Sequence, residues 1–195
     1  MKEVLIMRET KKKAEAKSYN LAKTDTGIRI GEVRFSYARV LEPNDKGKYS
    51  CCILIPQEDE EALDLIEDAI EAAKQKGSDR FWKGKVPKDV RTPLRDGDED
   101  HPEDDAFAGM MFLNASNNYQ PKVVKKDDFG FENIDDPAEF YSGCWGAVTL
   151  EFYPYDNSGN RGVAVSLGNI LKTRDDTRLA GTVETADSSF GDLAD

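Results

Sequence analysis

The sequence predicts a mainly β domain that contains one main helix and ends in a disordered acidic tail. Short segments with alternating or continuous apolar residues, which are typical of strands, recur along the chain. One segment, residues 58–76, instead places its apolar residues at helical spacing. The last residues are small, acidic and poor in apolar side chains. The 195 residues, 38% hydrophobic and 33% charged, suffice for one domain of ordinary size with extensions.

The N-terminal part supplies the first two strands. Residues 1–24 are polar and contain many lysines, which predicts a flexible arm. Residues 28–40 alternate apolar and polar positions as a strand does, and Gly31 predicts a bulge or bend within it. Phe35 and Tyr37 share one side of this strand with Val33, and this alternation assigns Phe35 to the core. Residues 49–56 are nearly all apolar, so we expect a central strand that ends at Pro56.

The predicted helix follows the second strand and spans residues 58–76. Acidic residues crowd its first turn, and Lys74 and Lys76 stand at its end, as the helix dipole favours. Gly77 is expected to close the helix. Its acidic outer face is most simply a solvated surface.

The C-terminal part is predicted to contain a long loop and further strands. Residues 81–100 include several prolines and glycines and form the loop, whereas residues 109–117 form a strand. We expect a strand and a charged turn in 119–128, a long strand in 140–155 and its returning partner in 161–175.

The way these strands are joined indicates a small barrel. Short turns imply antiparallel pairing, and glycines inside strands allow a sheet to curve and close. An OB-fold-like antiparallel barrel, named for oligonucleotide binding, is therefore the leading candidate. We assign residues 1–24 to the N-terminal arm, 25–178 to the barrel domain and 179–195 to the acidic C-terminal tail.

The net charge of −11 is unevenly distributed. Three acidic blocks, residues 58–71, 96–105 and 175–195, together carry −20, so the remainder carries +9. Such a basic remainder is compatible with a face that binds a polyanion. No apolar run approaches the length of a membrane span, and the N-terminal residues lack the order of a secretory signal. We therefore expect a cytoplasmic protein without a membrane partner.

Residue types that enzymes use are scarce. The single histidine, His101, lies in an acidic loop, and Cys51, Cys52 and Cys144 are expected to be ordinary buried thiols. The sequence has no phosphate-cradling glycine loop, and the acids of 96–105 lack the spacing of a calcium loop. We predict no enzyme activity, catalytic residue, cofactor or metal. A metal-dependent nuclease that uses the 96–105 acids is the least favoured alternative.

Aromatic residues beside lysines and arginines recur along the chain. This combination binds single-stranded nucleic acid, because bases stack on aromatic faces and basic groups neutralise phosphates. In FYPYDNSGNRGVAV, strand alternation assigns Phe152 to the core and directs Tyr153 and Tyr155 away from it, near Arg161. Trp145 lies between two glycines, where core and binding roles are equally favoured.

Seven blocks of the sequence, in this order, resemble one known family. The blocks are RFSYARVLEP (34–43), KYSCCILIP (48–56), WKGK (82–85), PLRDGD (93–98), FLNASN (112–117), YSGCWGAVTLEFYPYDNSGNRGVAVSLGNI (141–170) and LAGTVETADSSFGD (179–192). The set is similar to the tailed-phage single-stranded DNA-binding protein family, from about residue 28 to the end. The resemblance implies an OB-fold barrel, sequence-tolerant binding of single-stranded DNA, and a role in phage DNA replication or recombination in the host cell cytoplasm. It also implies that the acidic tail is a protein-interaction segment.

We therefore predict a non-catalytic single-stranded DNA-binding protein. Chemistry and block membership select its DNA-binding residues as Arg34, Tyr37, Arg39, Trp82, Lys83, Lys85, Arg95, Tyr119, Trp145, Tyr153, Tyr155 and Arg161. The tail residues expected to bind replication or recombination proteins are Asp187, Phe190, Asp192, Leu193 and Asp195. The alternative is a phage protein-interaction module, such as a recombinase loader or inhibitor. A homodimer is left open.

Overall fold

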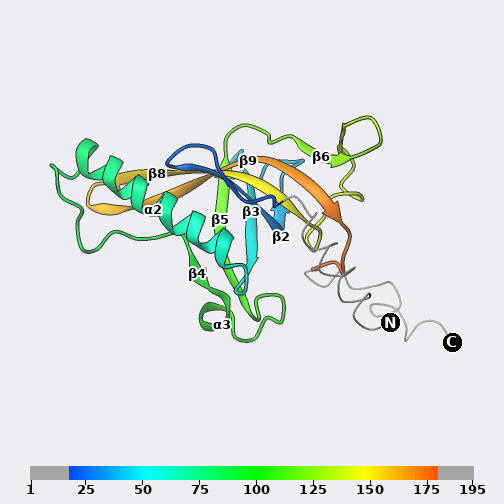
Figure 1. Ribbon diagram of the computed structural model, residues 1–195, viewed down its shortest axis with the longest axis horizontal. Helices are drawn as coiled ribbons and strands as arrows, with labels where there is room; N and C mark the ends of the chain where they lie inside the picture. Colours follow the sequence, from blue (N-terminus) through cyan, green and yellow to red (C-terminus); the bar gives the residue numbers. More distant parts are fainter. Residues whose placement is uncertain (1–17, 180–195) are drawn as a thin grey trace, which may run out of the picture.

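The computed structural model describes residues 18–179 (Figure 1). The predicted tail from residue 180 onward, with its five partner-binding residues, lies outside the described residues, as do residues 1–17. All strands within the described range belong to one sheet, whose main path runs β4-β5-β3-β2-β8-β9-β6-β7. No helix in this range is long and apolar enough to cross a membrane.

Five strands of this sheet close into a barrel. They are β2 (Gly27–Arg39), β3 (Tyr49–Pro56), β5 (Met110–Asn117), β8 (Trp145–Asn157) and β9 (Asn160–Arg174). Neighbours along β5-β3-β2-β8-β9 are antiparallel, and a parallel bridge between Ser116 and Ser166 joins β5 to β9. The first three strands thus form a meander, and the last two a hairpin that closes it. This arrangement is the five-stranded barrel of the OB fold, so the predicted fold class is confirmed.

Short strands extend the barrel at its margins. β1 (Leu21–Ala22) pairs with β2, although the sequence assigned these residues to the N-terminal arm. β4 (Arg95–Asp96) pairs with β5. β6 (Val123–Lys126) runs parallel to β9, and β7 (Phe131–Asn133) pairs with β6 to form a hairpin.

The predicted helix is present as α2 (Glu60–Arg80), but it does not end at Gly77. Asp59 caps its start by accepting a hydrogen bond from the Ala62 backbone N–H at 3.1 Å. A Cβ atom at Gly77 would lie 2.5 Å from the Trp82 ring. The glycine therefore does not stop the helix: it makes room for a tryptophan that packs against the helix side.

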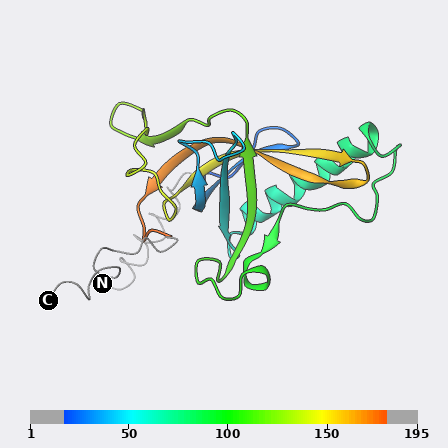
Figure 2. The same cartoon turned by 180° about the vertical axis from the view of Figure 1, so that it is seen from behind.

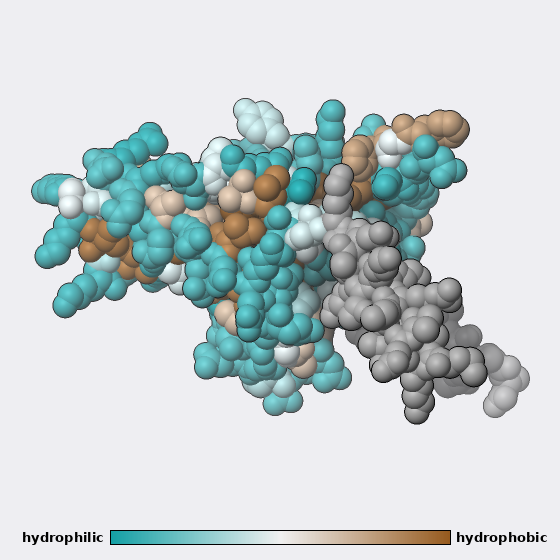
Figure 3. Space-filling model, viewed as in Figure 1, coloured by the Kyte–Doolittle hydropathy of each residue, from teal (hydrophilic) through white to brown (hydrophobic). Residues whose placement is uncertain are grey.

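The main core lies inside the barrel, and α2 crosses the barrel in front of β3 and β5 (Figure 1). Phe35 and Phe152 are fully buried there, as strand alternation predicts. The three cysteines are free and buried, also as predicted. Figure 3 shows that the side of the molecule on which α2 lies is mostly hydrophilic, which fits a solvated acidic helix face.

The end of α2 and the end of the β8–β9 hairpin project together from the barrel. We call residues 77–91 and 152–165 the lateral arm; it points left in Figure 1 and right in Figure 2. The loop that follows α2 is attached to β9, because the Arg91 N–H donates to the Arg161 carbonyl and the Val163 N–H donates to the Arg91 carbonyl. The sequence predicted a loop here but not this attachment.

Candidate nucleic-acid interface

The outer face of β2, β3 and β5 is turned toward the viewer in Figure 2. In OB folds the outer surface of the second and third strands, here β3 and β5, is a common oligonucleotide-binding site. Small polar side chains line part of it, because Ser50 pairs with Ser116 and Asn114 lies two positions earlier on β5. These side chains border a shallow hollow of about 130 Å³.

Tyr37 stands at the edge of this hollow. It lies where the register of β2 against β3 shifts, its φ is 46°, and 68% of its surface is exposed. Left-handed backbone is uncommon for a bulky residue and concentrates at ligand-binding positions. The irregularity turns Tyr37 outward, although simple alternation would place it on the core side with Phe35. A second hollow of about 290 Å³ borders the same ring.

Basic residues occur on the two loops that meet near this aromatic position, one after β2 and one after β5. The loop 40–48 contacts the loop after β5, because the Gln120 side chain donates to the Leu41 carbonyl at 3.1 Å. Tyr119, 81% exposed, follows β5 at this rim. The basic residues that lie here without an ion pair to any residue of 18–179 are Arg39, Lys46, Lys48 and Lys122. We call Tyr37, Tyr119 and these four residues the rim group.

Arg34 and Trp145 form a different group further along the outer face. The Trp145 indole N–H donates to the Asp176 carboxylate at 2.7 Å. Arg34 and Arg174 lie 3.6 and 3.9 Å from the same carboxylate, and the Arg174 guanidinium stacks 4.1 Å from the centre of the indole ring. The indole hydrogen bond, foremost, lowers the pKa of Asp176. We call these four residues the indole group.

The segment that carries Asp176, residues 175–179, lies on the sheet. Arg34 donates to the Thr177 carbonyl at 2.9 Å, and the Leu179 N–H donates to the Ser142 carbonyl at 2.8 Å. Gly143 has a φ of 119°, and a Cβ there would collide with the Thr177 carbonyl. Arg34 and Trp145, both predicted DNA contacts, are therefore already bonded to the chain's own acidic segment.

A second apolar cluster covers the lower part of the outer face. It consists of Cys52, Leu54, Phe107 and Phe112, and the loop that follows α3 (Gly97–Asp100) supplies Phe107. The His101 ring lies 4.2 Å from the Phe107 ring, centre to centre. His101 thus packs over the cluster, and no group of residues in 18–179 has the arrangement of a metal site.

Arg95, another predicted DNA contact, belongs to this covered part. Its side chain pairs with Asp100 at 2.5 Å and lies 5.0 Å from the centre of the Phe112 ring. Its charge is therefore already paired within the acidic loop.

The lateral arm carries the remaining predicted contacts. Trp82 is only 7% exposed and packs against Gly77 of α2, so the prediction that its ring is available to DNA is wrong. The following turn has left-handed backbone at Lys83 and leaves Lys83 and Lys85 exposed.

The hairpin of the arm divides its aromatic residues as alternation predicts. Tyr153 is 44% exposed and lies opposite the buried side of β8. Tyr155 covers Gly162, where a Cβ would lie 2.6 Å from its hydroxyl. Arg161 lies 3.4 Å from the Asp156 carboxylate and 3.7 Å from that of Asp89, so it is partly neutralised.

The predicted contacts thus separate into three regions and an isolated residue. Tyr37, Arg39 and Tyr119 lie at the rim, Arg34 and Trp145 meet at Asp176, the arm holds six more residues, and Arg95 stands apart. Sequence reasoning missed the polar hollow, although the alternation of Ser50, Asn114 and Ser116 with buried residues was a usable signal. It had no signal for the contacts of Asp176 with Trp145 and Arg34, which join segments far apart in sequence.

Comparison with known proteins agrees with this geometry. A family model described as Enterobacter phage Enc34, ssDNA-binding protein, matches residues 26–195. The chain belongs to this family. The family resemblance of the seven sequence blocks is thereby confirmed, and the match begins one residue before β2, so it includes the whole barrel.

Individual relatives extend over nearly the whole domain. Protein p50 of Acyrthosiphon pisum secondary endosymbiont phage 1 is 30% identical over 177 residues, which cover 86% of this chain and 94% of p50. The single-stranded DNA-binding protein of bacteriophage Enc34, solved with ssDNA, gives a TM-score of 0.67 at 24% identity and covers 85% of this chain and 99% of that one. The T7 single-stranded DNA-binding protein gp2.5 gives 0.57 at 16%, covering 88% and 96%. The two solved structures share this fold.

Proposed function

We propose that this protein binds single-stranded DNA on the outer face of its barrel, without sequence preference and without catalysis. The observation that carries the proposal is the exposed Tyr37 ring, which borders two hollows and lies near basic residues that form no ion pair within 18–179. Bases would stack on Tyr37 and Tyr119, and Arg39, Lys46 and Lys48 would neutralise phosphates. Stacking and phosphate contacts read no base edges, so such a surface tolerates any sequence.

The indole group supplies further contacts when segment 175–179 leaves the face. Arg34 and Trp145 then offer a guanidinium and an aromatic ring, the same combination as the rim group. While segment 175–179 lies on the sheet, Asp176 occupies the position where a phosphate would bind. DNA therefore competes with the chain's own carboxylate for this part of the surface.

Membership of a phage single-stranded DNA-binding protein family supports a proposal about the biological setting. We propose that the protein acts in phage DNA replication or recombination, in the host cell cytoplasm. The acidic C-terminal tail would bind partner proteins of those processes through Asp187, Phe190, Asp192, Leu193 and Asp195. A short acidic segment with apolar residues suits such docking.

A titration of fluorescent oligo-dT at low and high salt, with and without magnesium, tests the proposal. We expect tight binding at low salt that falls steeply as salt rises, because each phosphate contact releases a counterion. Binding that is absent, or insensitive to salt, would overturn the proposal. Cleavage of the oligonucleotide in magnesium would favour the nuclease alternative based on the acids of 96–105.

A further inference from the structure

The end of the lateral arm is the most basic surface segment among the described residues. Residues 80–91 contain five basic residues and one acid, in a chain whose net charge is −11. The five are Arg80, Lys83, Lys85, Lys88 and Arg91. None of them forms an ion pair with any residue of 18–179, whereas Arg34, Arg95 and Arg174 all do. Unpaired cations on a common segment are free to bind an anionic ligand.

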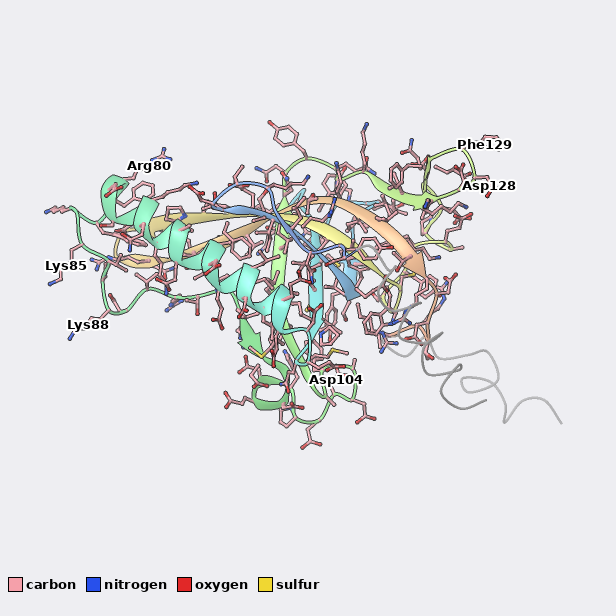
Figure 4. All side chains as sticks on the ribbon, in the orientation of Figure 1. Arg80, Lys85, Lys88, Asp104, Asp128 and Phe129 are labelled. Atoms are coloured by element: carbon pink, nitrogen blue, oxygen red, sulfur yellow. The ribbon has the colours of Figure 1, made fainter. Side chains whose placement is uncertain are left out.

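The arm presents these charges on a well-packed support. Gly77 of α2 lies against both the Trp82 ring and Pro154 of β8, and the backbone of Arg91 is hydrogen-bonded to β9 through its N–H and its carbonyl. Figure 4 shows Arg80, Lys85 and Lys88 projecting away from the ribbon at the end of the arm. The loop is therefore held in place while its basic side chains extend into solvent.

The arm surface is continuous with the outer face of the barrel. Ser116 on β5 pairs with Ser166 on β9, and Ser166, Ala164 and Gly162 alternate along β9, so they lie on one side. Tyr153 pairs with Ala164 and carries an exposed ring on this same side. Gly162 in turn bridges to Arg91 of the basic loop.

We infer that the lateral arm is a second DNA-binding region, which holds the phosphates of the same single strand beyond the barrel face. This inference rests on the proposed function. A strand that leaves the hollow beside Ser116 passes Tyr153, which can stack a base, and reaches the lysines at the end of the arm. Because the arm projects sideways from the barrel (Figures 1 and 2), it contacts only DNA that extends beyond the barrel face.

The test compares the double variant Lys85→Gln/Lys88→Gln with the control Lys23→Gln/Lys126→Gln. Both pairs are exposed and remove the same charge, but the control pair lies outside the arm. Each variant of the full chain is titrated with oligo-dT of about 8 and about 30 nucleotides, because one OB fold covers roughly 4–16. Unchanged thermal unfolding shows that the arm is still packed.

The arm variant should bind the short oligonucleotide as wild type does and the long one more weakly. Its slope of log affinity against log salt on the long oligonucleotide should be smaller by about 1.4, since each phosphate contact to a single strand contributes about 0.7. Equal affinities of the arm and control variants for the long oligonucleotide would overturn the inference but leave the proposed function standing. A loss of self-association in the arm variant, with DNA binding intact, would also overturn it and assign the arm to an acidic protein segment. Failure of wild type to bind either length would instead refute the proposed function.

Discussion

The rim group and the indole group lie on one face of one barrel and both combine aromatic and basic residues. They differ in whether another part of the chain already pairs with those residues. At the rim, Tyr37 is exposed and its basic neighbours form no ion pair with any residue of 18–179. In the indole group, the Asp176 carboxylate accepts the hydrogen bond of the Trp145 indole N–H and lies beside two arginines. An aromatic ring beside an arginine is therefore not enough to identify an open binding site. What matters is whether another part of the chain already pairs with it.

The largest expected effect on DNA binding concerns the rim group. Tyr37→Ala should weaken oligo-dT binding by about 1–3 kcal/mol, the usual contribution of one stacked base. Thermal unfolding should change little, because the ring is mostly exposed. Phe129→Ala is the matched control: Phe129 is 99% exposed but sits beside Asp127 and Asp128 at the tip of the β6–β7 hairpin (Figure 4). Equal affinities of the two variants would remove Tyr37 from the site.

A smaller change in DNA affinity, of opposite sign, is expected for the indole group. Asp176→Asn should raise oligo-dT affinity about two- to five-fold, the range of an exposed ion pair, because Arg34 and Arg174 lose their internal partner. Gly143→Ala should act in the same direction by pushing the Thr177 carbonyl off the sheet. Asp128→Asn removes the same charge from an exposed hairpin tip and should have no such effect. If Asp176→Asn weakens binding, the indole group does not contact DNA.

The smallest expected effect appears only at acidic pH and concerns the hydrogen bond between Asp176 and Trp145. The pKa of Asp176 lies below its ordinary value of 3.8, so its bond to Trp145 is fully formed above pH 3.8 and is lost as pH falls through the lowered pKa. The Trp145 indole N–H resonance in an NMR titration should stay constant from pH 7 to about 4 and shift only below that. The Trp82 indole resonance is the internal reference, because no carboxylate contacts it within the described residues. A shift of the Trp145 resonance near pH 6 would contradict the assigned contact.

Local sequence pattern was sufficient to predict the secondary-structure elements and many of the buried side chains. Alternation placed Phe35 and Phe152 in the core and Tyr153 outside, because a strand alternates its side chains whatever lies around it. It failed for Tyr37, where an irregular register and left-handed backbone turn the ring outward. Gly77 also misled, since a glycine permits a close contact as readily as it ends a helix.

The sequence by itself determined that this chain is a mainly β, OB-fold barrel with one main helix and belongs to a phage single-stranded DNA-binding protein family. These properties are carried by residue periodicity and ordered blocks, which are local. Only the tertiary structure decided which charges are free, because ion pairs such as Arg34 with Asp176 join residues distant in sequence. For the same reason, only the tertiary structure showed that Trp82 is buried in the lateral arm and that the lysines after it are exposed. It thereby separated the predicted DNA-binding residues into those that are accessible, those already paired with the chain, and those buried in the fold.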